Sequence, residues 1–341
     1  MARPPGPEQK RRLLDIRAAV ASPCQSCQSA PCCTYLPLDR FRVNALADID
    51  YARYVLNFDR IEVGATRQGD WSVYLVGACR HLDASGRCVL HGTGDKPHVC
   101  SQYSSHNCWY RPALVTGTGD YVRVDRRRLE WILERTRFDE RREIVELPGW
   151  DDLLEATAES PIGPLGTGLL TLPVINLATA GTAGSDRDVR SGAEHYDPCA
   201  GCSAYCCNSL VFPVGAPNTR SELDYLRFAL GFPGVSVTVL DDAWALNVAT
   251  TCRHLQSGRC SVYGQWERPL RCQNYDAWQC GYRAVFEPDE RRPSVTFRLE
   301  QFDVVAGQIQ YDDAGQALAV PHAADLAPVL AGTGAVSPAL R

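Results

Sequence analysis

The stretch Cys199-Ala-Gly-Cys202-Ser-Ala-Tyr-Cys206-Cys207, at residues 199–207, decides how this sequence is interpreted. It has a counterpart at residues 24–33, Cys24-Gln-Ser-Cys27-Gln-Ser-Ala-Pro-Cys32-Cys33, with the same order of a Cys-x2-Cys pair and two adjacent cysteines. A Cys-x2-Cys pair places two thiolates on one turn, where they can share a metal ion. Each stretch therefore predicts a metal site.

The remaining cysteines indicate that a much larger region is repeated. Eight cysteines lie in each region: Cys24, Cys27, Cys32, Cys33, Cys79, Cys88, Cys100 and Cys108 in the first, and Cys199, Cys202, Cys206, Cys207, Cys252, Cys260, Cys272 and Cys280 in the second. The offset between matching cysteines falls from 175 to 172 residues along the chain. Asp50-Tyr51 matches Asp224-Tyr225 in the same register, and Arg80-His81-Leu82 matches Arg253-His254-Leu255. Because this period far exceeds the roughly 20 to 50 residues of solenoid repeats, we predict a tandem of two whole domains.

The composition between and after the repeats sets the expected boundaries. We expect cysteine-cluster module 1 at 20–150, a linker at 160–194, cysteine-cluster module 2 at 195–312 and a flexible tail at 317–341. The linker contains Pro161, Pro164 and Pro173 among many Gly, Thr and Ala residues, a composition typical of loops. The tail is rich in Ala and Pro, with little that could cap a helix or pack.

Hydrophobic patterns place similar elements in both repeats. Each repeat is predicted to begin with a strand, at 34–38 and 208–214, and to have a second strand at 71–76 and 244–248. A helix is predicted between these strands, at 47–58 in the first repeat and from Ser221 in the second, where Asp224 is the acid of the N-terminal cap. A further helix is predicted at 126–138. Turns marked by Gly86, Gly258, Pro97 and Pro269 separate the later cysteines. The fold class we predict is α+β, with two small duplicated cysteine-rich modules stabilised by metal and built from short strands and helices.

Composition excludes several classes of protein. The chain of 341 residues is 45% hydrophobic and 22% charged, as in ordinary globular proteins. It carries 35 Lys and Arg against 40 Asp and Glu, a net charge of -5, so we expect no nucleic-acid partner. No stretch approaches the roughly 20 apolar residues of a membrane span, and residues 1–20 do not resemble a signal peptide. We therefore expect no membrane partner and a cytoplasmic protein.

The chain has sixteen cysteines. In a reducing compartment cysteines serve as metal ligands or redox groups more often than as disulfides. All sixteen are candidate ligands. Eight thiolates per module could hold two tetrahedral zinc ions, or one iron-sulfur cluster with four left over. Adjacent cysteines rarely direct both sulfurs at one ion, so we expect Cys32-Cys33 and Cys206-Cys207 to split between sites or to leave one free thiol. His81 and His254 are auxiliary ligands or, alternatively, donors to a loop carbonyl.

These motifs resemble a known family. The Cys-x2-Cys-x3-Cys-Cys stretch, followed by Cys-Arg-His-Leu at 252–255, Gly-Arg-Cys-Ser-Val-Tyr at 258–263 and Arg-Pro-Leu-Arg-Cys-Gln-Asn-Tyr at 268–275, resembles the YkgJ-type cysteine-cluster family of zinc- or iron-chelating domains. The resemblance covers about residues 20–112 and 195–285, although the family's namesake spacing is Cys-x2-Cys-x2-Cys-Cys. It implies metal chelation. A similar cluster occurs in flagellin lysine methylases, but this chain has no Gly-rich nucleoside loop, so that activity is not carried over.

The sequence leaves more than one function open. We expect a metal-binding protein that chelates zinc or an iron-sulfur centre in two repeated modules. The alternative is an iron-sulfur-dependent enzyme that modifies a protein or peptide by redox chemistry or methyl transfer, and an interaction scaffold or metal store is a third interpretation. Whether the protein is an enzyme is left open. If Cys79, Cys88, Cys100 and Cys108 act together with the first cysteine cluster, replacing Cys100 or Cys272 by Ala lowers the metal content of its own module only. Loss of metal from both modules would count against independent sites.

Overall fold

The computed structural model describes residues 15–20, 27, 30–103, 108, 121–158, 202–241, 243–275, 280–286 and 293–333. We call residues 15–158 the first half and residues 202–333 the second half. The first half contains α1 (Ile16–Val20), η2 (Pro31–Cys33), β1 (Tyr35–Arg42), α2 (Leu46–Val55), β2 (Ile61–Thr66), β3 (Asp70–Val76), α3 (His98–Ser101), β4 (Tyr121–Val124), α4 (Arg126–Arg135), β5 (Arg137–Phe138), β6 (Ile144–Glu146) and α5 (Trp150–Ala158). The expected linker at 160–194 lies outside the described residues.

The second half follows a closely similar order of elements. It contains α6 (Tyr205–Asn208), β7 (Ser209–Pro213), α7 (Arg220–Leu230), β8 (Val235–Leu240), β9 (Ala243–Ala249), β10 (Leu255–Gln256), β11 (Arg259–Cys260), α8 (Leu270–Gln273), α9 (Gly281–Phe286), β12 (Ser294–Phe297), η7 (Leu299–Gln301), α10 (Phe302–Ala306), β13 (Gln310–Tyr311), β14 (Ala317–Ala319) and α11 (Ala323–Ala331). The fold is mixed α and β with short strands and helices, as the sequence predicts.

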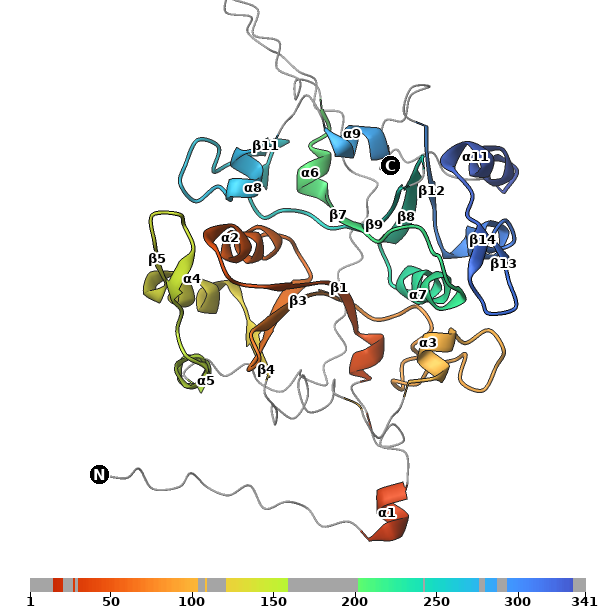
Figure 1. The fold of residues 1–341 in the computed structure, drawn as a ribbon, viewed down its shortest axis with the longest axis horizontal. Helices are drawn as coiled ribbons and strands as arrows, with labels where there is room; N and C mark the ends of the chain where they lie inside the picture. The colour runs from red at the N-terminus through yellow and green to blue at the C-terminus, as the bar shows by residue number, and fades with distance from the viewer. Residues whose placement is uncertain are drawn as a thin grey trace, which may run out of the picture.

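Each half is built on a four-stranded antiparallel sheet (Figure 1). The strand order is β1-β3-β2-β4 in the first sheet and β7-β9-β8-β12 in the second. In both, a helix joins the first two strands, and the second and third strands form a hairpin. Strands β2 and β8 lie outside the elements predicted from the sequence, although Val235, Val237 and Val239 alternate with polar residues as a half-buried strand requires.

One hydrophobic core joins the two halves. Most of the buried hydrophobic residues of both sheets and of α2 and α7 belong to a single connected cluster, whereas Tyr35 and Tyr74 form a second, smaller one. Trp71 on β3 and Trp244 on β9, which match in the repeat register, are 3% and 1% exposed. The core therefore supports both sheets at once, while much of the cysteine-bearing segments 83–96 and 256–266 is exposed.

Helix α7 begins earlier than the sequence predicts. Its N-cap is Thr219, whose side chain accepts a hydrogen bond from the backbone N–H of Glu222, while the Glu222 carboxylate accepts one from the N–H of Thr219. The predicted cap at Ser221 with Asp224 is therefore wrong. The reciprocal Thr219–Glu222 pair satisfies two free N–H groups of the first turn, and Asp224 is left for another contact.

The expected flexible tail is wrong as far as residue 333. Residues 317–319 form β14, and α11 packs against β12 and α10 with Ala323, Leu326 and Leu330 buried. Pro328 lies inside this helix, and the apolar contacts stabilise the helix although proline disfavours it. Residues 334–341 lie outside the described part. The helix expected at 126–138 is α4, which ends at Arg135.

Among the described residues, no helix is both long enough and apolar enough to span a membrane.

Candidate metal centres

The cysteines come together at one edge of each sheet. In the first half, η2 carries Cys32 and Cys33 immediately before β1, and Cys79 follows β3, the strand beside β1. The backbone N–H of Cys79 donates to the carbonyl of Cys33, with an N···O distance of 2.7 Å. In the second half, the N–H of Cys252 donates to the carbonyl of Cys207 at the same distance. The strand pairing therefore brings cysteines 46 and 45 residues apart in sequence into contact.

A strained residue precedes both adjacent cysteine pairs. Ala30 has φ 37° and Ala204 has φ 55°, both in the left-handed region, and these two alanines match in the repeat register. A non-glycine residue there costs about 1 kcal/mol. The bend turns the chain into the short helix that presents the cysteines, so the same unfavourable geometry is maintained at both centres.

The adjacent sulfurs of the first half lie close to each other. Sγ of Cys32 is 3.9 Å from Sγ of Cys33. Two sulfurs bound to one tetrahedral zinc at about 2.3 Å are about 3.8 Å apart. The separation therefore fits one metal shell, and the steric reason to expect that adjacent cysteines split between sites does not apply to this pair.

Further thiols lie within electrostatic range of each adjacent pair. Electrostatic interaction links the thiols within each group, which we call the first cluster (Cys32, Cys33, Cys79, Cys88 and Cys100) and the second cluster (Cys206, Cys207, Cys252, Cys260 and Cys272). The five positions of one cluster match those of the other in the repeat register. Each cluster thus draws its thiols from four separate segments of its half.

In each cluster, one of the two adjacent thiols donates a hydrogen bond to the other. A hydrogen bond from Cys33 lowers the pKa of Cys32 to about 7, and the same bond raises the pKa of Cys33. In the second cluster, the bond with Cys207 lowers the pKa of Cys206 to about 7, and Cys207 again has the raised pKa. One thiolate in each pair is therefore within reach of neutral pH, which is the form that binds a metal.

Cations lie beside both clusters at matching positions. Burial raises the pKa of Cys100 to about 12, and the charge of Lys96 opposes that rise. In the second cluster, burial raises the pKa of Cys272 to about 12, with Arg268 opposing it. Lys96 and Arg268 each precede the proline that begins the short cysteine helix. The repeat register alone aligns these two cations, and a cation near several thiolates reduces their mutual repulsion.

The two paired histidines contribute backbone donors. Burial raises the pKa of Cys79, and a hydrogen bond from the backbone N–H of His81 opposes this. The N–H of His254 donates in the same way to Cys252. The Nε2 atom of the His254 ring is buried and has no hydrogen-bond partner among the described residues, and burial together with Arg126 and Arg253 lowers the pKa of this ring. A neutral, unsatisfied ring nitrogen fits a metal ligand.

The last cysteine of each repeat lies among tyrosines. Cys108 packs with Cys32 against the buried rings of Tyr35 and Tyr74. In the second half, the hydroxyl of Tyr275 donates to Sγ of Cys280 over 3.2 Å. Cys108 thus adjoins the first cluster at Cys32, whereas Cys280 contacts a tyrosine hydroxyl.

The remaining candidates are only partly placed. Cys24 and Cys199 lie outside the described residues, whereas Cys27 and Cys202 are half-buried. Apart from Cys27, the described cysteines are free thiols, at positions 32, 33, 79, 88, 100, 108, 202, 206, 207, 252, 260, 272 and 280. Within the described part of the chain, no three His, Cys, Asp or Glu side chains form a group that could hold a metal ion as they stand. In each Cys-x2-Cys pair only the second cysteine, Cys27 or Cys202, belongs to the described residues.

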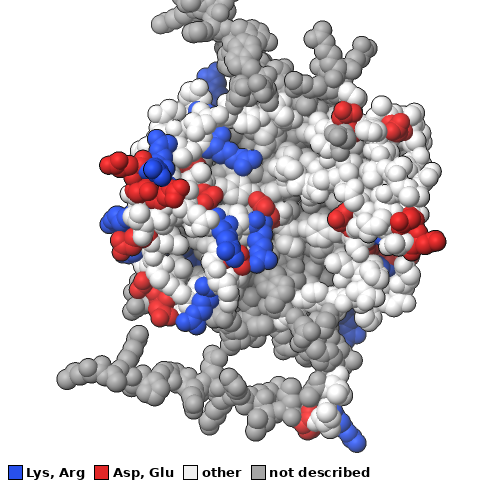
Figure 2. All heavy atoms as spheres, in the orientation of Figure 1, with Lys and Arg blue, Asp and Glu red and all other residues white. Residues whose placement is uncertain are grey.

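The surface of the viewed face mixes the two signs of charge. Figure 2 shows basic and acidic side chains next to one another over the region of α2, α4 and α8. Arg126 and Glu130, for example, form an ion pair along α4. Such mixing is typical of a solvated surface.

Comparison of the chain with known proteins returned no match to a family model, a curated protein or a solved structure.

Proposed function

We propose that the protein binds zinc or an iron-sulfur centre through two copies of one cysteine-cluster module, one in each half. The single observation that carries this proposal is a matching arrangement in the two halves: a backbone hydrogen bond joins Cys79 to Cys33 and Cys252 to Cys207, and further thiols at matching positions lie within electrostatic range. Buried thiols without a metal or disulfide would be small apolar side chains, and nothing in that role requires ten of them at matched positions.

The donor set suits a thiophilic metal. Thiolates bind zinc and iron-sulfur clusters in preference to magnesium or calcium, and N–H donors to sulfur together with Lys96 and Arg268 stabilise the charged form. Cys27 and Cys202, with Cys24 and Cys199, would complete the two shells. The resemblance to the YkgJ-type cysteine-cluster family supports the same conclusion. When bound, the metal would fix segments that contribute little to the apolar core.

The direct test is metal and acid-labile sulfide analysis of protein purified without oxygen. We expect either stoichiometric zinc and no colour, or iron with sulfide and a broad absorption band at about 400 nm. Cys100→Ser and Cys272→Ser should each lower the metal content, whereas Ser101→Ala and Gln273→Ala, on the same two helices, should not. Wild-type protein that holds neither zinc nor iron would refute the proposal.

One observation favours the enzymatic alternative, an iron-sulfur-dependent enzyme that acts by redox chemistry or methyl transfer. A pocket of about 260 Å³ opens beside the first cluster, between the two halves, and its lining includes His81, Pro97, Arg227, Phe302 and Asp303. The pocket lining contains no described cysteine, but His81 and Pro97 are two and three residues from Cys79 and Cys100 in the sequence. This function requires iron and sulfide with an open coordination position, so a finding of zinc alone would exclude it.

A further inference from the structure

The helix of each half contacts the cysteine helix of the other half. Helix α2 lies against α8, which carries Cys272, and helix α7 lies against α3, which carries Cys100 (Figure 1). Both cysteine helices have only four residues. Helices this short are not stable by themselves, so an outside contact must hold each of them in place.

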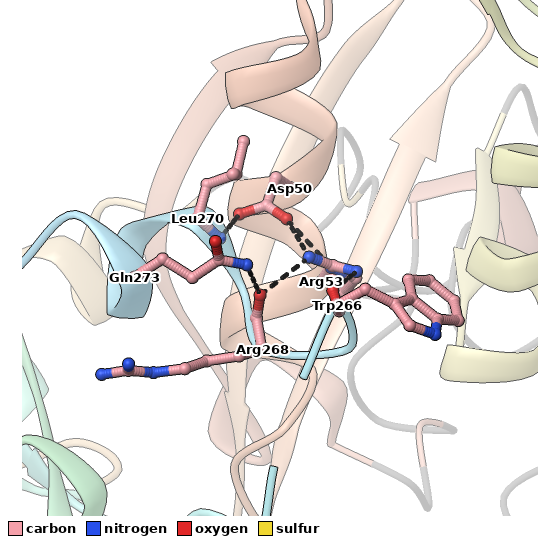
Figure 3. A network of polar contacts seen from close by, with 6 residues as sticks. All are labelled: Asp50, Arg53, Trp266, Arg268, Leu270 and Gln273. Carbon is pink, nitrogen blue, oxygen red and sulfur yellow. Dashed lines mark hydrogen bonds and ion pairs between the residues drawn. The ribbon is translucent and has the colours of Figure 1, made fainter. Parts of the chain in front are cut away.

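Asp50 of α2 provides that contact for the second cluster. Its Oδ2 accepts a hydrogen bond of 2.6 Å from the backbone N–H of Leu270, the first residue of α8. Arg53 binds the other oxygen of Asp50 at 2.6 Å, and its guanidinium also donates to the carbonyls of Trp266 and Arg268 (Figure 3). A carboxylate at a helix N-terminus satisfies a free N–H group and interacts favourably with the helix dipole.

Asp224 of α7 makes the reciprocal contact. Its Oδ2 accepts a hydrogen bond of 2.7 Å from the N–H of Val99, in the first turn of α3. Asp50 and Asp224 match in the repeat register, and the two acceptors therefore cap matching helices in opposite directions across the molecule. We call these two hydrogen bonds the crossed caps.

A second pair of reciprocal contacts lies on the other side of each cluster. The N–H of Arg253, next to Cys252, donates to the carbonyl of Asn57 just beyond α2, and the N–H of Arg80, next to Cys79, donates to the carbonyl of Gly231 just beyond α7, both over 2.8 Å. A Cβ atom on Gly231 would lie 3.1 Å from Sγ of Cys79. Glycine thus allows the end of α7 to approach the first cluster closely.

We propose that Asp50 and Asp224 are positioning residues for the cysteine cluster of the opposite half, so that the two metal centres are assembled as a coupled pair. This inference rests on the proposed function for its metal and goes beyond it by naming the groups that set each site. It also replaces the expectation of independent modules, because each cluster depends on a helix from the other repeat.

Pulsed alkylation of the zinc-loaded full chain, read peptide by peptide in a mass spectrometer, tests the crossing. Removal of a group that orients a metal ligand typically costs about tenfold or more in metal affinity. We therefore expect Asp50→Asn to speed alkylation of Cys272 about tenfold, with Cys100 changed less than about twofold. Asp224→Asn should give the reverse pattern. Because both clusters are read in the same sample, each serves as the reference for the other.

Matched controls lie on the same two helices. Asp48 and Glu222 match in the repeat register, and each accepts backbone N–H groups at the start of its own helix. Asp48→Asn and Glu222→Gln weaken these helices without touching a crossed cap, so they should leave both alkylation rates within about twofold. Circular dichroism checks that every variant is folded. Asp224 is the less buried of the two carboxylates, and Asp224→Asn alone carries the test if Asp50→Asn does not fold.

The outcomes separate this inference from the proposed function. Acceleration in the same half, equal acceleration in both halves, or no change would overturn the inference even if metal is bound. Wild-type protein without zinc or iron refutes the proposed function, and the same alkylation of the metal-free chain then decides whether Asp50 and Asp224 position the opposite cysteines. The crossed pattern in metal-free protein supports positioning, and its absence there overturns it.

Discussion

The two crossed caps bind neighbouring backbone positions, the N–H of the first residue of α8 (Leu270) and that of the second residue of α3 (Val99), and they also differ in what supports them. Asp50 is 4% exposed and shares its carboxylate with Arg53, which also ties down two carbonyls of the loop before α8. Asp224 is half-buried, and the matching arginine, Arg227, lies with its guanidinium 5.8 Å from the Phe302 ring and lines the pocket. The second cluster is thus closed by a polar network, whereas beside the first cluster the equivalent cation faces a cavity.

The two short helices that carry Cys272 and Cys100, α8 and α3, also differ in the side chains that hold them. Arg271 of α8 places its guanidinium 5.5 Å from the rings of both Tyr51 and Tyr54 on α2. Val99 holds the matching position on α3 and is 38% exposed. Both halves therefore keep a carboxylate–backbone contact to the cysteine helix, while the side chains that support it differ.

Replacement of Asp50 and Asp224 should give the largest difference in stability between the two halves. Asp50→Ala leaves Arg53 partly buried without its partner and should lower the free energy of unfolding by about 3 kcal/mol. Asp224→Ala removes a more exposed cap and should cost about 1 kcal/mol. Urea unfolding followed by circular dichroism measures both values. Equal losses would show that burial of the Asp50 network contributes no extra stability.

Replacement of the matched arginines should give a smaller difference. Arg53→Lys keeps the charge but loses the fork that binds Asp50 and the carbonyls of Trp266 and Arg268 together, so we expect a loss of about 1.5 kcal/mol. Arg227→Lys should stay within about 0.5 kcal/mol. The same unfolding measurement applies. A larger loss for Arg227→Lys would mean that the pocket side carries the structural role.

An exchange between the cysteine helices should have the smallest effect. Arg271→Val removes the cation from the two tyrosine rings and should cost about 0.5 to 1 kcal/mol. Val99→Arg places a cation near Tyr225 and Phe228, which match Tyr51 and Tyr54 in the repeat register, and should gain less than about 0.5 kcal/mol. Differential scanning calorimetry resolves both as shifts of the unfolding temperature in opposite directions. Shifts of the same sign would contradict the assigned contacts.

The local elements could be predicted from the sequence because their signals are local. The runs ending at Val76 and Val248 form the central strands β3 and β9, and the regular spacing of Leu223, Leu226 and Leu230 identifies α7. Helix α11 was missed because Pro328 and the alanine-rich composition argue against a helix, while its stability comes from burial of Leu326 and Leu330 against distant elements. Propensity alone contains no information about that contact.

The sequence likewise predicts some features of the candidate site and not others. Cysteine spacing singled out the thiols, and the register between repeats linked Asp50 with Asp224, but neither indicates that the partner helix belongs to the other repeat. Asp50 and Leu270 are 220 residues apart, and Val99 and Asp224 are 125 apart. Contacts over such separations depend on how two sheets pack together. For the same reason, the sequence pattern favoured independent modules.

The reciprocity of the crossed caps has an evolutionary consequence. When Asp50 serves the second repeat and Asp224 serves the first, the contact has the form of an isologous interface, as in a two-fold homodimer. A homodimer can change such an interface only at both copies together, since one gene encodes both. In a single chain the two sides can change separately, and they do differ: Arg53 and Arg271 lie on one side, where the other side has Arg227 and Val99.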